Sequence, residues 1–238
     1  MQLQKLKDYQ AELDGKSPVE IISWAIENFG TGNMALASSM SAEDQLLTDM
    51  LLKIAPSFTV FTLDTGRLPQ ETFAVIAETA RKYCVKVEIV FPEASQVEAM
   101  VNDSGPNLFF DSHEKRKRCC LVRKIVPLGR KLASLKVNAW ICGLRSEQSP
   151  TRAAVQAVEW DSTFNLFKIN PLANWTERQV WDYIHDHNVP YNKLHDAGYP
   201  SIGCACCTRA VALGEDVRSG RWWWEQPEHK ECGLHLSD

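Results

Sequence analysis

Residues 34–54 have the sequence MALASSMSAEDQLLTDMLLKI, and this stretch sets the class of fold. Its apolar beginning, Met34 to Ala37, predicts a short buried strand, and the run from Ala42 to Ile54 predicts a helix. Small hydroxylated residues connect the two. A buried strand, a short polar loop and a helix together form the repeating unit of α/β proteins.

The same order of elements continues on both sides of this unit. Apolar residues at helical spacing follow Ser17-Pro18, and later apolar runs are rich in the β-branched and aromatic residues that favour strands. We expect further strands over residues 58–63, 85–91, 137–143 and 164–169, and helices over 18–29, 69–83 and 115–132. Strands separated by helices predict a mostly parallel, doubly wound α/β sheet, in which ligands bind beyond the carboxyl ends of the strands.

Composition limits the possible classes of function. The chain has 238 residues without an internal repeat or low-complexity stretch, so we expect one domain over 1–238, with a mobile C-terminal tail over 215–238. Thirty acidic and 26 basic residues give a formal net charge of −4, which argues against general nucleic-acid binding. No apolar run reaches the ~18 residues of a membrane helix, and no secretory signal is evident. We expect a cytoplasmic protein that binds no membrane.

Three loops that follow predicted strands carry polar or cationic side chains. Their sequences are SSMSAEDQ at 38–45, LDTGRLPQET at 63–72 and GLRSEQSPTR at 143–152. Taken singly, each has a plainer explanation: helix capping, a capped turn or solvated arginines. Because the three loops meet at one sheet edge, together they favour a site for a nucleotide-like anion. No P-loop lysine follows the first loop, which argues against a P-loop nucleoside triphosphatase.

Cysteines supply a second signal. A cytoplasmic protein keeps its thiols reduced, so eight cysteines indicate metal ligands, nucleophiles or buried apolar residues. Cys119 and Cys120 are adjacent in KRKRCCLVRK, residues 115–124, and three more lie in IGCACCTRA, residues 202–210. Two paired sets predict a four-thiolate site for zinc or an iron–sulfur cluster. Tandem cysteines favour the cluster because neighbouring side chains point in different directions.

The other cysteines have different surroundings. We expect Cys84 and Cys142 to be small buried hydrophobes. Cys232 lies in EHKECGLHLSD, where nearby cations would lower the pKa of its thiol and activate it; a bystander thiol on a terminal segment is the alternative. The three tryptophans at 222–224 are expected to pack this tail against the body of the protein.

The motifs follow one another in a specific order: SSMSAED, LDTGRLPQETF, RCCLVRK, GLRSEQSPTR, IGCACCTRA, GRWWWEQ and ECGLH. This combination resembles the assimilatory adenylyl-sulfate reductases that carry a 4Fe-4S cluster. The resemblance implies an adenine nucleotide α-hydrolase-like fold. It also implies reduction of adenosine 5′-phosphosulfate to sulfite and AMP in sulfate assimilation, with thioredoxin or glutaredoxin as reductant. The implied cluster ligands are Cys119, Cys120, Cys204 and Cys207, with Cys232 as the nucleophile that carries a thiosulfonate.

The resemblance also implies a substrate site. Attack of a thiolate on a sulfate group brings two anions together, so cations must screen the approach. The implied substrate-binding residues are Ser38, Ser39, Asp44, Leu63, Asp64, Thr65, Gly66, Arg67, Lys124, Arg152, Arg218, Arg221 and His235. The chain departs from the family pattern at Cys206, inside the CxxC, and at Ser41, where glycine is common. We expect a homo-oligomer.

Three other functions remain open on the sequence. The first is reduction of 3′-phosphoadenylyl sulfate, or of both nucleotides, because the chemistry is the same and one phosphate differs. The second is an ATP-using tRNA-thiolating or adenylating enzyme of similar fold, although SSMSAED does not match the SGGxDS loop of that class. The third is a zinc-binding or redox-sensing module without catalytic activity.

Overall fold

A six-stranded sheet forms the centre of the computed structural model, which describes residues 2–212 and 214–226. The strands are β1 (Met34–Ser38), β2 (Val60–Leu63), β3 (Glu88–Val90), β4 (Ala139–Ile141), β5 (Val158–Asp161) and β6 (Leu166–Ile169). Their spatial order is β3-β2-β1-β4-β6-β5. Every pairing is parallel except that of β5 with β6 at the sheet edge. The predicted mostly parallel sheet is confirmed.

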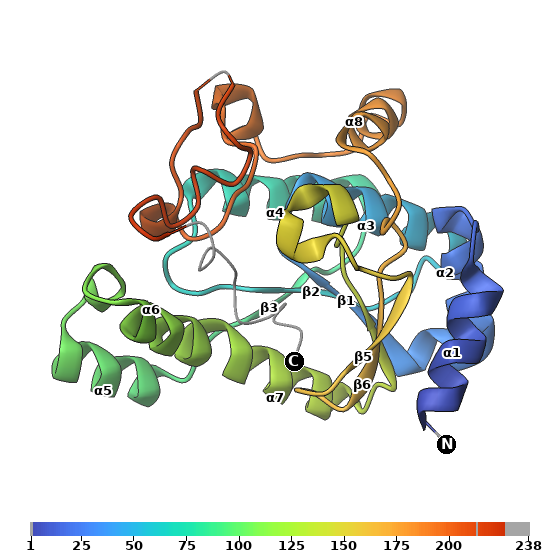
Figure 1. Ribbon diagram of the computed structural model, residues 1–238, viewed down its shortest axis with the longest axis horizontal. Helices are drawn as coiled ribbons and strands as arrows, with labels where there is room; N and C mark the ends of the chain where they lie inside the picture. The colour runs from blue at the N-terminus through green and yellow to red at the C-terminus, as the bar shows by residue number, and fades with distance from the viewer. Residues whose placement is uncertain (1, 213, 227–238) are drawn as a thin grey trace.

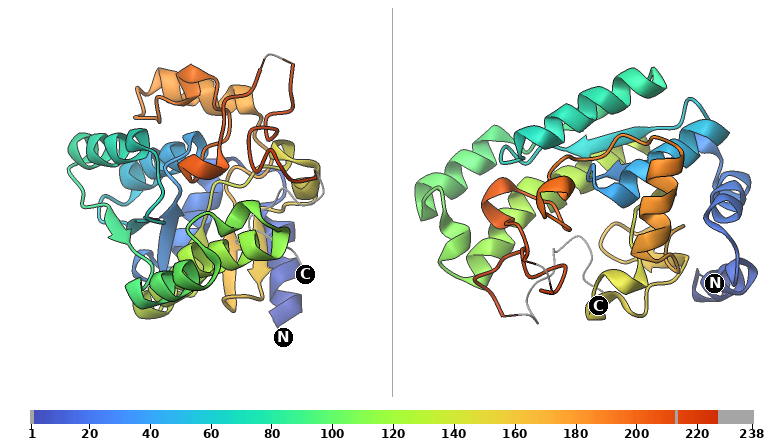
Figure 2. Two further views of the ribbon diagram at one scale, coloured as in Figure 1. Left: turned by 90° about the vertical axis from the view of Figure 1, so that its left-hand side faces the viewer. Right: turned by 90° about the horizontal axis from the view of Figure 1, so that it is seen from above.

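Helices cover both faces of the sheet. They are α1 (Gln2–Leu13), α2 (Pro18–Phe29), α3 (Ala42–Ile54), α4 (Gln70–Tyr83), α5 (Ala94–Ser104), α6 (His113–Cys120), α7 (Val126–Leu135) and α8 (Glu177–Asp186). Figure 1 shows α3, α4 and α8 on one side and α5, α6 and α7 on the other, and Figure 2 shows the same layers from two further directions. Separate apolar cores fill the two sides, and the doubly wound α/β class is confirmed.

Local sequence explains where several helices begin. The Ser17 side chain accepts a hydrogen bond from the Glu20 backbone while the Glu20 carboxylate accepts one from the Ser17 backbone, and Pro18 occupies the first turn. This capping box starts α2 at the predicted position. The helix predicted over 115–132 is instead two α-helices joined by a π-helical segment, Leu121–Ile125. Such segments are frequent at functional sites.

Three elements and one cysteine differ from expectation. Helices α1 and α5 and the edge strand β5 were not predicted, because their apolar residues are few or irregularly spaced. Cys142 is buried as expected, but Cys84 is exposed. Cys84 is the C-cap residue of α4 and has the left-handed conformation, with φ of 53°, that commonly ends a helix.

The connection order places a topological switch point at the centre of the sheet. From β1 the chain proceeds to β2 on one side, whereas β4 lies against β1 on the other. Loops leaving β1 and β4 therefore diverge, and the carboxyl ends of these strands border a crevice. Within the described part of the chain, no helix has the length and apolar character needed to cross a membrane.

Candidate active site

A cavity of about 370 Å³ opens at this switch point, within the size range of small-ligand sites. We call it the switch-point cavity. Predicted substrate-binding residues in its wall are Ser38, Ser39, Asp44, Leu63, Thr65, Lys124, Arg152, Arg218 and Arg221. Asp64, Gly66 and Arg67 are not part of this wall. Cys232 and His235 lie outside the described residues.

Asp44 joins the loops that follow β1 and β4. One carboxylate oxygen accepts hydrogen bonds from the backbone nitrogen and hydroxyl of Ser39, at 2.7 and 2.5 Å, and the other accepts one from Gly143 N at 2.9 Å. Burial raises the pKa of Asp44 above its usual range, more than these hydrogen bonds lower it. Asp44 therefore ties the loop after β1 to the loop after β4, whereas Ser41, the N-cap residue of α3, makes no side-chain capping hydrogen bond.

The loop after β2 turns toward the cysteines. Asp64 accepts a hydrogen bond from Gly66 N at 2.7 Å, which closes a tight turn. The Thr65 hydroxyl lies 3.2 Å from Cys204 Sγ, and the Thr65 carbonyl accepts a hydrogen bond from Arg123. The Arg67 guanidinium contacts the Pro106 carbonyl. This loop therefore lies between the cavity and the cysteine residues.

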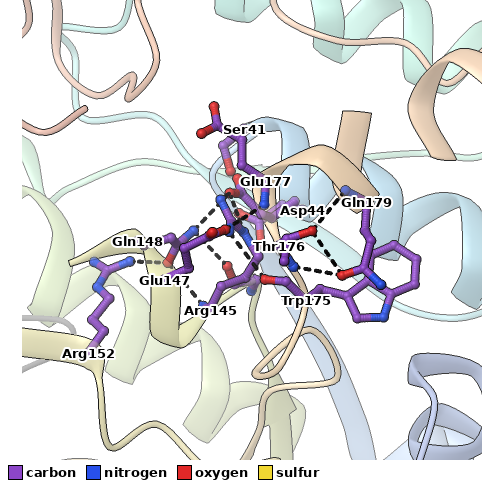
Figure 3. Close-up of polar contacts among 12 residues, drawn as sticks. Ser41, Asp44, Arg145, Glu147, Gln148, Arg152, Trp175, Thr176, Glu177 and Gln179 are labelled. Carbon is purple, nitrogen blue, oxygen red and sulfur yellow. Dashed lines mark hydrogen bonds and ion pairs between the residues drawn. The ribbon is translucent and has the colours of Figure 1, made fainter. Parts of the chain in front are cut away.

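The loop after β4 carries a buried polar network that the sequence did not reveal. Arg145 donates to Glu43 Oε1 through Nε at 3.0 Å and Nη2 at 2.9 Å. It also contacts Glu147 (Figure 3). Gln148 donates to the same Glu43 oxygen at 2.9 Å and accepts from Arg152 Nη1 at 2.5 Å. Glu43 thus positions the Gln148 side chain, and Gln148 in turn positions the Arg152 guanidinium in the wall of the cavity.

A second, smaller pocket contains the predicted cluster ligands. We call it the cysteine pocket; Cys119, Cys120, Cys204 and Cys207 line it and are each 8% exposed, and Cys206 lies beside them. Burial is the largest cause that raises the pKa of Cys119. The Cys206 pKa is lowered to about 6, first by a hydrogen bond with Cys207 and then by Arg67. The cations of this wall are Arg67, Arg116, Arg123, Lys124 and Arg221.

The donor set decides which metal group the cysteine pocket fits. Among the described residues, no three or more His, Cys, Asp or Glu side chains are grouped to hold one metal ion. A zinc ion needs every sulfur about 2.3 Å away from it. A four-iron cluster instead takes one thiolate at each iron, so its ligand sulfurs stand farther apart. Four buried thiols that share one pocket with several cations are a donor set that would hold an iron–sulfur cluster.

The comparison with known proteins agrees with this arrangement. The sequence profile of the phosphoadenosine phosphosulfate reductase domain matches residues 33–210. The chain belongs to this family. It is 51% identical over 203 residues to the adenosine 5′-phosphosulfate reductase of Allochromatium vinosum, covering 85% of this chain and 78% of that one. It is 43% identical over 235 residues to the Pseudomonas aeruginosa LESB58 protein of the same name, covering 96% and 85%.

Solved structures give the same result for the fold. The phosphoadenylyl-sulfate reductase of Candida auris, in a phosphate complex, superposes with a TM-score of 0.73 at 27% identity, over 87% of this chain and 96% of that one. The Candida glabrata FMN adenylyltransferase shares the fold alone, with a TM-score of 0.56 at 13% identity over 90% and 72% of the two chains. The predicted reductase family and its nucleotide-binding fold are confirmed, and the chain is an oxidoreductase.

In this family member the two pockets share part of their walls. Lys124, Arg221 and Trp222 line both the switch-point cavity and the cysteine pocket. Lys124 comes from the π-helical segment directly after Cys120, whereas Arg221 comes from the segment that precedes position 232. Trp222 is 1% exposed, and the Trp224 ring lies 4.4 Å from that of Phe110. Trp222 and Trp224 thus pack this segment against the body, as expected, whereas Trp223 is 40% exposed.

Sequence reasoning missed Glu43 and Gln148 as site residues. Glu43 has the charge opposite to Arg145, and both follow the carboxyl ends of neighbouring strands. Their opposite charges could indicate an ion pair only once β1 and β4 were known to be adjacent in the sheet. His195 also lines the cavity. Its buried Nε2 has no hydrogen-bond partner in the described part of the chain, and burial lowers its pKa. No sequence pattern distinguished it.

Proposed function

We propose that this chain reduces adenosine 5′-phosphosulfate to sulfite and AMP in assimilatory sulfate reduction, using thioredoxin or glutaredoxin. The observation that carries the proposal is the shared wall: Lys124 and Arg221 border both the switch-point cavity and the cysteine pocket. Cations at this boundary suit a substrate with adjacent phosphate and sulfate groups. The relatives named adenosine 5′-phosphosulfate reductase support the same substrate.

The cavity offers distinct surroundings for the two ends of such a nucleotide. Lys124, Arg152, Arg218 and Arg221 supply positive charge for the phosphosulfate, and arginines bind such oxyanions through paired donors. Apolar wall residues suit a purine; they are Ala37, Leu63, Leu128, Trp140 and Leu144. Ser38, Ser39, Asp44, Asp64, Thr65, Gly66 and Arg67 complete the proposed substrate loops, and His235 belongs to the same assignment.

Cys232 is the proposed nucleophile. Its thiolate attacks the sulfate sulfur, the bond from that sulfur to the bridging oxygen breaks, and AMP leaves with the electron pair. The protein then carries a thiosulfonate on Cys232. A thiolate of the dithiol reductant attacks Cys232 Sγ and releases sulfite, and its second thiolate closes a disulfide, so that two electrons pass from the reductant to sulfur.

Cys119, Cys120, Cys204 and Cys207 are the proposed ligands of a 4Fe-4S cluster. When bound, the cluster supplies structural and electrostatic support to the site. Lys124 faces both pockets and would balance thiolate charge on one side while it binds substrate on the other. We further propose that residues 1–238 form one domain whose segment 215–238 delivers Cys232 to the cavity, and that the protein is a cytoplasmic homo-oligomer.

The nucleophile is tested by trapping its adduct. Protein given adenosine 5′-phosphosulfate without reductant should gain the mass of one sulfonate group, located on the peptide that contains Cys232. Cys232→Ser should gain none and release no sulfite, yet bind AMP as the wild type does. Cys84→Ser is the matched control, because Cys84 is exposed and outside both pockets. A sulfonate on another cysteine would refute the assignment.

Ligand assignment and substrate class are tested separately. Serine at Cys119, Cys120, Cys204 or Cys207 should lower bound iron and acid-labile sulfide, whereas Cys206→Ser should retain both. Iron lost from Cys206→Ser and kept by Cys207→Ser would contradict this set. For the substrate, kcat/KM should be higher with adenosine 5′-phosphosulfate than with its 3′-phosphorylated analogue. Equal values would indicate a dual-specificity reductase, and the reverse preference would refute the proposal.

A further inference from the structure

A buried ion pair connects the first cysteine helix to the segment that leads to Cys232. Arg116 of α6 donates from Nε to Glu225 Oε1 at 2.8 Å, and the two side chains are 0% and 6% exposed. The other Glu225 oxygen is buried and has no hydrogen-bond partner among residues 2–212 and 214–226. The presence of a buried ion pair is weak evidence that it stabilises the fold. Removing one of its two partners is nevertheless strongly destabilising, because the other charge is then buried without a counter-charge. This pair therefore fixes the relative position of two segments that are distant in sequence.

The same arginine stacks on a tryptophan of that segment. The guanidinium carbon of Arg116 lies 4.5 Å from the centre of the Trp222 ring, and that of Arg221 also lies 4.5 Å from it. One buried indole thus contacts two cations, which a ring quadrupole stabilises most when water is excluded. Trp222 has φ of 41°, a conformation that a residue with a side chain adopts only where its surroundings require it.

The second cysteine loop holds this segment from the other side. Trp222 N donates to the Cys207 carbonyl at 3.3 Å, and Arg221 forms an isolated antiparallel bridge with Thr208. The Arg221 guanidinium packs directly on Gly203. Residues 221–225 therefore lie between the two cysteine-bearing elements, with the ion pair on one side and backbone hydrogen bonds on the other.

We propose that Arg116 and Glu225 form a clasp that positions the Cys232 segment, and that Glu225 is a positioning residue for the reaction. The clasp fixes Arg221 in the wall shared by both pockets and sets the direction in which the chain leaves toward Cys232, seven residues beyond Glu225. The effect of the clasp on the reaction rests on the proposed function. The clasp itself, being a contact within the protein, does not.

Hydrogen exchange of the holoprotein tests the clasp without catalysis. In Glu225→Gln the Arg116 guanidinium loses the buried carboxylate that accepts from its Nε, so the Trp222 and Glu225 amides should exchange at least about tenfold faster than in the wild type. Bound iron should be unchanged, because the cysteine side chains are intact. With adenosine 5′-phosphosulfate, KM should rise about tenfold as Arg221 loosens, and kcat should fall as well. Arg116→Met should show the same faster exchange and higher KM, and Arg116→Lys, which keeps a positive charge, should show a smaller change in both.

Glu215→Gln is the matched control. Glu215 lies in the same part of the chain and pairs with Arg209, but both side chains are 40% exposed. This variant should change neither exchange nor kinetics. Unchanged exchange in Glu225→Gln would overturn the clasp, and so would iron lost in parallel with activity, because the pair would then support only the cysteine pocket. If the wild type failed to reduce the nucleotide, the proposed function would fail, whereas hydrogen exchange would still decide the clasp.

Discussion

Replacing Arg145 with methionine should lower the free energy of unfolding, because Arg145 is the main charged partner in the loop after β4. Arg145 and Glu43 are 5% and 14% exposed at their side chains, and two guanidinium nitrogens donate to one Glu43 oxygen. Methionine fills much of the same volume but carries no charge. Arg145→Met therefore leaves the Glu43 carboxylate buried, with Gln148 as its remaining side-chain donor among the described residues.

The expected loss follows from these contacts. Hydrogen bonds to charged groups contribute about 1.5–3 kcal/mol each, and breaking a buried pair by removing one partner costs about 3–5 kcal/mol. The contact with Glu147 adds less than about 1 kcal/mol, because that carboxylate is 55% exposed. Gln148 still donates to Glu43, so we expect the free energy of unfolding to fall by about 3 kcal/mol.

Urea denaturation at pH 7 measures this loss, with Arg178→Met as the control because the Arg178–Asp182 pair is 89% and 63% exposed. Glu43→Gln added to Arg145→Met should recover most of the loss, since the Glu43 carboxylate that Arg145→Met leaves without its guanidinium is then replaced by a neutral amide. A loss below about 1 kcal/mol, or no recovery in the double variant, would refute the reasoning.

The pH dependence of the same variant has a definite sign. Burial alone would raise the pKa of Glu43, but Arg145 and Gln148 outweigh it and hold the pKa below its usual value. A depressed folded-state pKa gives stability that is present above the unfolded value of about 4.3 and is lost as pH falls through the folded value. The difference between wild type and Arg145→Met should therefore shrink below about pH 4. A difference that grows on acidification would contradict this account.

Two further predictions concern other buried groups. In Gly203→Ala the new Cβ would lie 2.7 Å from Arg221 Cζ, so AMP should bind about tenfold more weakly by calorimetry, whereas Gly32→Ala, with open space around its Cβ, should not change binding. Tyr183→Phe removes the hydroxyl that donates to Asp49 at 2.7 Å and should cost about 1.5 kcal/mol at pH 7 in urea denaturation. Burial raises the pKa of Asp49, but hydrogen bonds from Lys53 and two tyrosines lower it by more, so the net pKa lies below its usual value. The cost of Tyr183→Phe should therefore fade as pH falls below about 3.9 and Asp49 becomes protonated. A cost independent of pH would exclude an ionised Asp49 as the partner.

The sequence determined the class of fold because its signals are local. Buried runs such as Met34–Ser38 and capped helices such as Pro18–Phe29 carry their own periodicity and end signals, and α3 begins and ends where predicted. The edge strand β5 was missed because it is short and only one of its residues is buried. Pairing with β6 across a tight turn, which no local pattern specifies, is what makes it a strand.

For the site, the sequence determined the types of residue available, and the tertiary structure decided which of them meet. Tandem cysteines, a distant CxxC and cationic loops were readable directly, because each depends on residues close together in the chain. The Glu43–Arg145 pair spans 102 residues and the Arg116–Glu225 pair 109, so both exist only through the order of strands and the packing of helices. Burial then turned these charges from solvated side chains into fixed partners, because a charge removed from water needs a counter-charge nearby.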